Sequence, residues 1–216
     1  MGTRNLTCVQ KDNKLVVSKY CQWDGYPDGQ GLTVISFIKS VFDKDLFIQK
    51  LKNVSEATEK YLKKINKELG IKPSSDGWIT MEDTDRLRKS YPHLQRDMGG
   101  EILAFIQMND KDIDIKLNKD VGFALSSLFC EYAYVLNLDE DTLDFYTGFN
   151  EDAPEINIFY PTALDEYPCG DNRDKYFNVR KLASFSFADI KRLKTKTIIN
   201  RMEKAEKEAG VKFTQE

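Results

Sequence analysis

Hydrophobic and polar residues alternate near both ends of the chain, and this pattern predicts strands there. Residues 4–10 and 14–23 are rich in β-forming side chains and flank a polar turn at 11–13. Residues 128–138 alternate again, and 143–147 alternate after a second polar turn. We therefore expect one β-hairpin near the start, another at about 129–147, and a further strand over 177–187.

The middle of the chain has a helical period instead. Apolar residues recur three and four positions apart from Leu32 to Phe42, and a second short helix is expected from 43–45 through Leu51. A third helix has a continuous apolar face, with Asn53 or Ser55 as its expected N-cap and Gly70 as its stop.

Three more helices follow from capping signals and apolar spacing. Thr80 is expected to cap a short helix that ends at Tyr91-Pro92, and Asp97 to cap the next one. The second of these contains Gly99 and Gly100, which cost a helix about 1 kcal/mol each relative to alanine. That cost suggests close packing there, against the glycine-rich residues 22–31. A charged helix is expected over 188–209.

The order of these elements predicts the fold class. Strands lie at both ends and helices between them, which favours an α+β fold with one mainly antiparallel sheet built from both chain ends. The helical middle spans about 32–108, and a helix ends the chain. No linker or repeat divides the sequence, so we expect a single domain over residues 1–216. Residues 150–175 contain three prolines and predict a long excursion.

Residues 22–31 (QWDGYPDGQG) have the most unusual composition, and three interpretations apply. A glycine-rich turn before a helix suits a bound phosphate, but Val34 replaces the last glycine of the dinucleotide motif and no P-loop lysine is present. Asp24 and Asp28 would also repel phosphate. The remaining interpretations are a structural turn with Trp23 and Tyr26 packed on the sheet, or a recognition loop that presents both aromatics.

Composition and charge narrow the function classes. The net charge of −3 provides no basic field, so we expect no direct binding of nucleic acid. No apolar run approaches the ~20 residues that cross a bilayer, and no apolar leader opens the chain, so we expect a cytoplasmic protein without membrane contact. Four scattered cysteines predict reduced, mostly buried thiols. We expect no cofactor.

Common catalytic and metal-binding patterns are weak in this chain. His93 is the single histidine, and its place after Pro92 predicts a histidine in a surface turn rather than a catalytic base. One histidine also excludes multi-histidine metal sites. Asp139-Glu140-Asp141 resembles the start of a calcium loop but lacks the later Asp or Asn followed by Gly, so we expect a hairpin turn.

Residues 137–175 are strongly acidic, with 11 acidic and 2 basic side chains. Such a segment is usually a solvated loop. The alternative is an acidic surface that faces a basic partner, such as a nucleic-acid channel in another protein. The candidate residues for that surface are Asp139, Glu140, Asp141 and Asp144.

Several motifs together resemble a known family. They are RNLT at 4–7, QWDGYP at 22–27, GQG at 29–31, Arg96-Asp97, and FCEYAYV at 129–135. The chain resembles, over most of its length, a family of small bacteriophage, prophage and gut Firmicutes proteins without an assigned activity. Phage accessory proteins of this size are often inhibitors of host defence, so the resemblance implies a bacterial defence component, such as a CRISPR effector, as partner.

Two hypotheses about function follow. The first is a binding protein of the host cell cytosol that acts by stoichiometric contact, through Trp23, Tyr26 and the acidic segment. The second is a small-molecule site or enzyme, in which arginines hold an anionic ligand and Asp24 or Asp97 acts as a base. We favour the non-enzymatic hypothesis and leave the oligomeric state open. The candidate binding residues are Arg4, Asn5, Trp23, Asp24, Tyr26, Gln30, Arg96 and Asp97.

Overall fold

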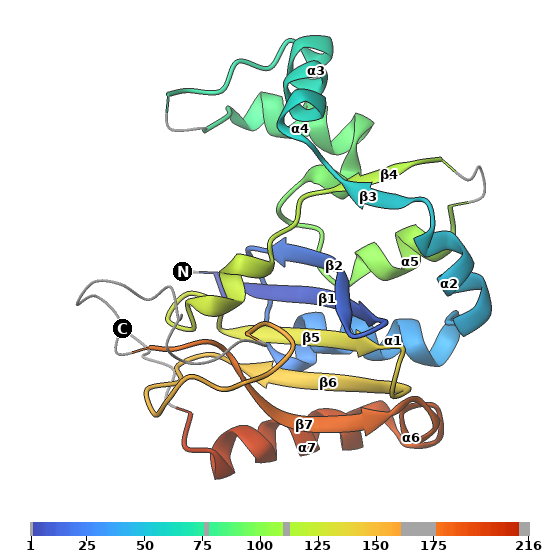
Figure 1. Ribbon diagram of the computed structural model, residues 1–216, viewed down its shortest axis with the longest axis vertical. Helices are drawn as coiled ribbons and strands as arrows, with labels where there is room; N and C mark the ends of the chain where they lie inside the picture. The colour runs from blue at the N-terminus through green and yellow to red at the C-terminus, as the bar shows by residue number, and fades with distance from the viewer. Residues whose placement is uncertain (1, 76–77, 110–112, 161–175, 212–216) are drawn as a thin grey trace.

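A five-stranded sheet forms the centre of the computed structural model, which describes residues 2–75, 78–109, 113–160 and 176–211 (Figure 1). Its strand order is β2-β1-β5-β6-β7. The bounds are β1 (Asn5–Lys11), β2 (Lys14–Cys21), β5 (Tyr132–Asn137), β6 (Thr142–Thr147) and β7 (Arg180–Ser186). β1 and β5 are parallel, and the other neighbours are antiparallel. The protein is therefore α+β, with a mainly antiparallel sheet built from both chain ends.

Both predicted hairpins are confirmed, and their turns are joined at one end of the sheet. Asp12 and Asn13 have φ of 54° and 55°, the positive values that a tight two-residue hairpin turn requires. The carboxylate of Asp139, in the β5–β6 turn, accepts hydrogen bonds from the backbone N–H groups of Asp12 (2.8 Å) and Asn13 (2.9 Å). The segment 139–141 is thus a hairpin turn, as predicted.

Helices cover one face of the sheet, and they form the main hydrophobic core with it. They are α1 (Leu32–Ser40), α2 (Lys44–Leu51), α5 (Glu101–Gln107), α6 (Phe187–Arg192) and α7 (Thr195–Glu208). On the other face, a smaller core includes Leu6, Val135 and Ala124, the last from the short helix Val121–Leu125.

Cys8, Cys21 and Cys130 are buried free thiols, which confirms the prediction for them, and Cys169 lies outside the described residues.

A smaller unit lies beyond the edge strand β2 (Figure 1). It consists of the parallel strands β3 (Val54–Glu56) and β4 (Ile115–Leu117) together with α3 (Glu59–Leu69) and α4 (Met81–Ser90). The predicted cap at Asn53 or Ser55 is wrong because these residues belong to the pairing of β3 with β4. The Ile115 N–H donates to the Asn53 carbonyl at 2.7 Å, and Thr58 caps α3 instead.

Two other helix ends were predicted correctly from capping residues in the sequence. Gly70 ends α3 with a positive φ of 67°, and the Thr80 hydroxyl accepts a hydrogen bond from the Asp83 N–H at 3.1 Å. The predicted cap at Asp97 is wrong, since α5 begins after Gly100 without a side-chain cap. The Asp97 carboxylate lies 3.4 Å from the Arg88 guanidinium instead.

Three further predictions need correction. The helix expected over 188–209 is two helices, because Leu193 and Lys194 have extended backbone conformations. Lys39 on α1 donates to the carbonyls of Ile190 and Leu193, both at 2.6 Å, where α6 ends. The loop expected over 22–31 becomes a π-helical turn at Pro27–Gly31 that runs into α1. The last strand begins at Arg180 rather than 177. Residues 161–175 of the predicted excursion lie outside the described ranges.

Candidate functional site

The strand directions bring most of the predicted site segments to one end of the sheet. β1 and β5 begin at this end and β2 finishes there. The Gln22 N–H donates to the Arg96 carbonyl at 3.1 Å, and the Glu131 N–H donates to the Arg4 carbonyl at 3.1 Å. We call this region, residues 2–5, 22–31, 94–100 and 127–131, the loop end.

The backbone of residues 22–31 is fixed by internal hydrogen bonds. The Gln30 N–H donates to the Asp24 carbonyl at 2.7 Å, and the Tyr134 hydroxyl donates to the Gly25 carbonyl at 2.7 Å. Asp24 has a φ of 55°, and a Cβ on Gly29 would lie 2.3 Å from the Asp24 carbonyl oxygen. Glycine at position 29 is therefore required by the close approach of the chain to itself.

These same bonds argue against a phosphate cradle. The N–H groups of Gly29 and Gly31 donate to the Tyr26 carbonyl at 3.0 and 3.2 Å, and that of Gln30 to Asp24. A phosphate site needs such N–H groups free to point at the ligand. In the turn before α1, these N–H groups already donate to carbonyls of the loop itself.

Two of the predicted binding residues hold the loop from inside the protein. Asn5 is fully buried, and its side-chain amide donates to the carbonyls of Trp23 (3.1 Å) and Cys21 (3.4 Å). Gln30 is also buried, and its Oε1 accepts from the Gly100 N–H at 2.6 Å. The prediction that these two residues contact a partner is corrected, because neither faces solvent.

Close packing of the Gly99-Gly100 pair against residues 22–31 is confirmed. A Cβ on Gly99 would lie 2.4 Å from the Gln30 side-chain oxygen, and one on Gly100 would lie 3.0 Å from side-chain atoms of α1. A methyl group at either position would therefore displace Gln30 or α1. The two glycines explain how the loop rests directly on the start of α5.

The aromatic side chains of the loop remain accessible on this rigid backbone. Trp23 is 47% exposed and Tyr26 48% exposed. The Trp23 ring lies against Gly2, and the Tyr26 ring centroid is 5.9 Å from that of Tyr132. Each ring thus has one supported side and one open side, which combines the structural and the recognition interpretations of the loop.

Two further exposed aromatic rings are paired with arginines of the loop end. The Arg4 guanidinium lies 5.0 Å from the centroid of Phe129, which is 44% exposed, and its Nε is 3.5 Å from the Glu131 carboxylate. The Arg96 guanidinium lies 5.9 Å from the centroid of Trp78, which is 67% exposed. Sequence reasoning missed Trp78. A lone tryptophan in the otherwise polar segment after Gly70 is the signal that could have identified it.

Arg96 and Asp97, two of the predicted binding residues, contact each other. The Arg96 Nε lies 3.8 Å from the Asp97 carboxylate, which also faces Arg88. Asp97 is therefore shared between two arginines, which favours its role in fixing the 94–100 segment. Asp24 contributes to the loop through its backbone.

The predicted acidic residues lie around the β5–β6 hairpin turn, at the opposite end of the sheet. Asp144 is buried and bonded to Ser184 (2.5 Å) and Lys181 (2.7 Å), so its assignment to an acidic surface is wrong. Asp139 holds the two hairpin turns together, and Asp141 lies 2.5 Å from the Lys44 ammonium. Glu140 is exposed. Most of these predicted acidic residues therefore make contacts within the protein and do not form a free acidic surface.

His93 is packed rather than exposed, which corrects the prediction of a surface histidine. Its ring lies 5.2 Å from that of Phe105, and within the described ranges neither ring nitrogen has a hydrogen-bond partner. Burial, together with the nearby positive charge of Lys19, lowers the pKa of His93 to about 4. The imidazole is therefore neutral at physiological pH, and no nucleophile is paired with it in the described structure.

Metal and membrane sites can be tested only on the described part of the chain. There, no group of three or more His, Cys, Asp or Glu side chains is arranged to hold a metal ion. No helix in the same ranges is long and apolar enough to cross a membrane. Comparisons of the chain with protein-family models, curated proteins and solved structures found no match. The fold and this surface define a mixed α+β protein with an aromatic and arginine-bearing end.

Proposed function

We propose that the protein acts by stoichiometric binding of a partner protein through the loop end. The observation that carries the proposal is the exposure of Trp23, Tyr26 and Phe129 on the loop end, where Arg4 lies against Phe129. Arg96 of the loop end also lies against the exposed ring of the neighbouring Trp78. Tryptophan, tyrosine and arginine are the residue types that dominate binding energy at protein interfaces. A preformed loop also avoids the entropy cost of ordering on binding.

The resemblance of the loop motif to phage and prophage proteins extends the proposal to its partner. A component of a bacterial defence system, such as a CRISPR effector, in the host cytosol is the partner that it implies. The net charge of −3 supports contact with the protein component rather than with nucleic acid.

An affinity experiment tests the proposal. The tagged protein is used to capture partners from Firmicutes lysates, with quantitative mass spectrometry as the readout. We expect a partner that forms a complex of fixed stoichiometry, measured by light scattering with purified components. Trp23→Ala combined with Tyr26→Ala should reduce its capture about tenfold or more, since truncation of an aromatic residue at the energetic centre of an interface costs at least ~2 kcal/mol.

Met108→Ala provides the matched control. Met108 is an exposed apolar residue at the end of α5, outside the loop end. Its variant should capture the partner as well as the wild type does, and all variants should unfold at similar temperatures. Equal capture by the Trp23/Tyr26 variant would contradict the proposal, and turnover of a substrate by the isolated protein would favour the enzymatic alternative.

A further inference from the structure

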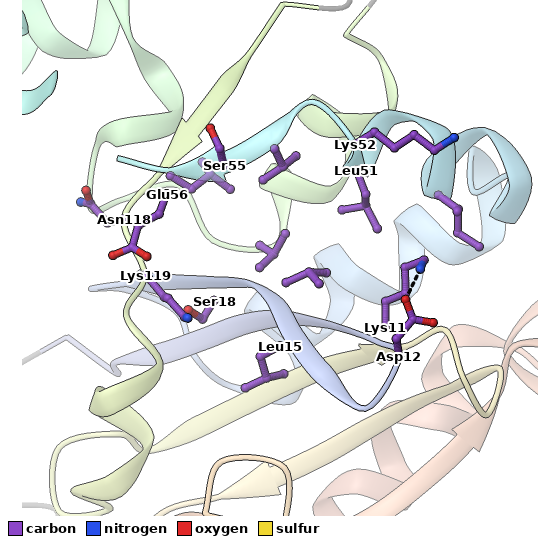
Figure 2. Close-up of a pocket in the computed structure, with 15 residues that line it drawn as sticks. Lys11, Asp12, Leu15, Ser18, Leu51, Lys52, Ser55, Glu56, Asn118 and Lys119 are labelled. Carbon is purple, nitrogen blue, oxygen red and sulfur yellow. Dashed lines mark hydrogen bonds and ion pairs between the residues drawn. The ribbon is translucent and has the colours of Figure 1, made fainter. Parts of the chain in front are cut away.

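A cavity of about 500 Å³ separates the edge strand β2 from the β3–β4 sheet (Figure 2). Its volume is within the range of about 300–1,000 Å³ that is typical of small-molecule sites. It is lined by β2, the end of α2, β3 and the segment that follows β4. This site is separate from the aromatic surface of the loop end.

The centre of the cavity is apolar. Val17 and Leu51 contribute from the main core, and Leu117 and Val54 contribute from the β3–β4 sheet. Val16 is 43% exposed and lies where the register of β1 and β2 shifts. A ligand in this cavity would therefore bury an apolar body against branched side chains.

One end of the cavity is polar. Ser18 is 3% exposed, lines the cavity, and its hydroxyl has no hydrogen-bond partner within the described ranges. The Asp120 N–H donates to the Ser18 carbonyl at 3.2 Å, so residues 118–120 run beside Ser18. Figure 2 shows Asn118, Lys119 and Ser18 toward the same end of the cavity. A buried hydroxyl without a partner is costly unless a ligand or solvent satisfies it.

The charged side chains around the cavity carry a small positive excess. Lys11, Lys52 and Lys119 line it, against the two carboxylates of Asp12 and Glu56. Lys11 is paired with Asp12. In the described part of the chain, Lys52, Lys119 and Glu56 form no ion pair, and Figure 2 shows Glu56 toward the same end of the cavity as Lys119. The lining therefore keeps an excess of one positive charge, with Lys52 toward the other end.

We propose that this cavity binds a small amphipathic carboxylate. Its apolar body lies between Val17, Leu51 and Leu117, and its carboxylate accepts hydrogen bonds from the Ser18 hydroxyl and the Lys119 ammonium. A charge-assisted hydrogen bond to each oxygen fixes the orientation of the ligand. The chain provides here, in one place, the apolar wall, the unpartnered donor and the cation that such a ligand requires.

An added peptide strand fits the site less well. The regular part of the outer edge of β2 is already covered, since Asp120 bonds to the backbone of Ser18 and Tyr20, and Arg96 to that of Gln22. The uncovered part contains the register shift at Val16. A strand pairs poorly along such an irregular edge.

Decanoate is a suitable probe, and 1-decanol and acetate separate its two parts. Titration calorimetry with the full chain should show saturable, one-to-one binding of decanoate. Decanol, which keeps the chain but lacks the charge, should bind at least about tenfold more weakly. Acetate should not bind. Decanoate without saturable binding, or decanol that binds equally well, would overturn the proposal.

Substitutions locate the site. Lys119→Met, which keeps the apolar stem, should weaken decanoate binding about tenfold and leave decanol unchanged. Ser18→Ala should weaken decanoate binding several-fold without lowering the melting temperature of the free protein, because the hydroxyl has no internal partner. Val54→Phe should fill the cavity and abolish binding of both. Lys196→Met, on the exposed side of α7, is the matched control and should bind like wild type.

Other results would reject the assignment. Equal weakening by Lys119→Met and Lys196→Met would show a general charge effect instead of a site. A clear loss of stability in ligand-free Ser18→Ala would show that the hydroxyl is used inside the protein. Binding of an acidic extended peptide in the absence of decanoate binding would support strand pairing at β2 and overturn the proposal.

Discussion

His93 and Glu206 are partly buried side chains whose pKa values shift in opposite directions. Burial, reinforced by Lys19, lowers the pKa of His93 from 6.5 to about 4. Burial raises the pKa of Glu206 from 4.5 to about 7, although a hydrogen bond with Tyr132 partly opposes the shift. Both shifts favour the neutral form, because an apolar environment penalises a charge.

Stability should therefore contain two opposing pH dependences. As pH falls from 6.5 to 4, His93 binds a proton in the unfolded chain but not in the folded protein. Protonation therefore favours the unfolded chain, and the stability that neutral His93 contributes is lost. As pH rises from 4.5 to 7, folded Glu206 retains a proton that the unfolded chain releases, so its contribution is lost in that direction. His93→Phe should unmask the Glu206 dependence, and Glu206→Gln the His93 dependence, in urea titrations between pH 4 and 7.5. Variants whose profiles run parallel to that of the wild type would contradict both assignments.

The role of a residue could be predicted from the sequence where it depends on neighbouring residues. The predicted contact of Gly99 and Gly100 with residues 22–31 is confirmed, although both glycines precede α5 instead of lying within it. Asn5, Asp144 and Ser18 were not anticipated as buried, since their neighbours come from distant segments. The type of a polar residue does not reveal which strand or loop will cover it.

Among the elements, the break between α6 and α7 is contacted by the Lys39 side chain of α1. Its ammonium donates to the carbonyls of Ile190 and Leu193 at 2.6 Å and to that of Lys191 at 3.4 Å. A cation at a helix C-terminus is favourable both as a donor and through the helix dipole. Lys39 therefore holds α6 against α1.

Lys39→Met should lower the free energy of unfolding by about 1–2 kcal/mol, as expected for loss of a charged donor at carbonyls that keep few other partners. Urea denaturation measures the change. Lys196→Met removes a lysine from an exposed position on α7 and should change stability by less than ~0.5 kcal/mol. A change of that small size for Lys39→Met would show that the helix end is satisfied without the ammonium.

Helix ends with local caps were predictable, and those fixed by tertiary contacts were not. Gly70 and Thr80 signal their roles within a few residues of sequence. The pairing of β3 with β4 joins segments about sixty residues apart, as the hydrogen bond from Ser55 to Asp114 shows. Three-residue strands carry too little alternation to be recognised without their partner.

At the scale of the whole molecule, burial is uneven. All six residues of β5 are buried. By contrast, Ile65 is the buried residue of α3, and Asp83 that of α4. The unit beyond β2 therefore has little apolar burial to hold it closed against local opening.

Native-state hydrogen exchange should reveal this difference. We expect backbone amides of β1 and β5 to exchange slowest, at the rate of global unfolding, and those of α3 and α4 to exchange much faster through local opening. Mass spectrometry of peptic fragments resolves these segments. Protection of α3 equal to that of β5 would show that the two regions unfold as a single unit.

The fold class was predictable because alternation and helical period dominate long segments. The strand order was not, because the parallel contact between β1 and β5 joins strands that the sequence separates by the entire helical middle. Hairpin patterns specify antiparallel neighbours within one hairpin. They leave open how two hairpins associate.

That parallel contact also determines when the protein can fold during synthesis. β1 and β2 can pair as soon as they leave the ribosome, but the other edge of β1 has no partner until Asn137 has been made. At translation rates of about 5–20 residues per second, the nascent hairpin waits roughly 5–20 seconds. During that time Leu6 and Val9, fully buried in the finished sheet, remain uncovered on an open strand edge. We therefore expect translation speed and early chaperone contact to affect the yield of this chain.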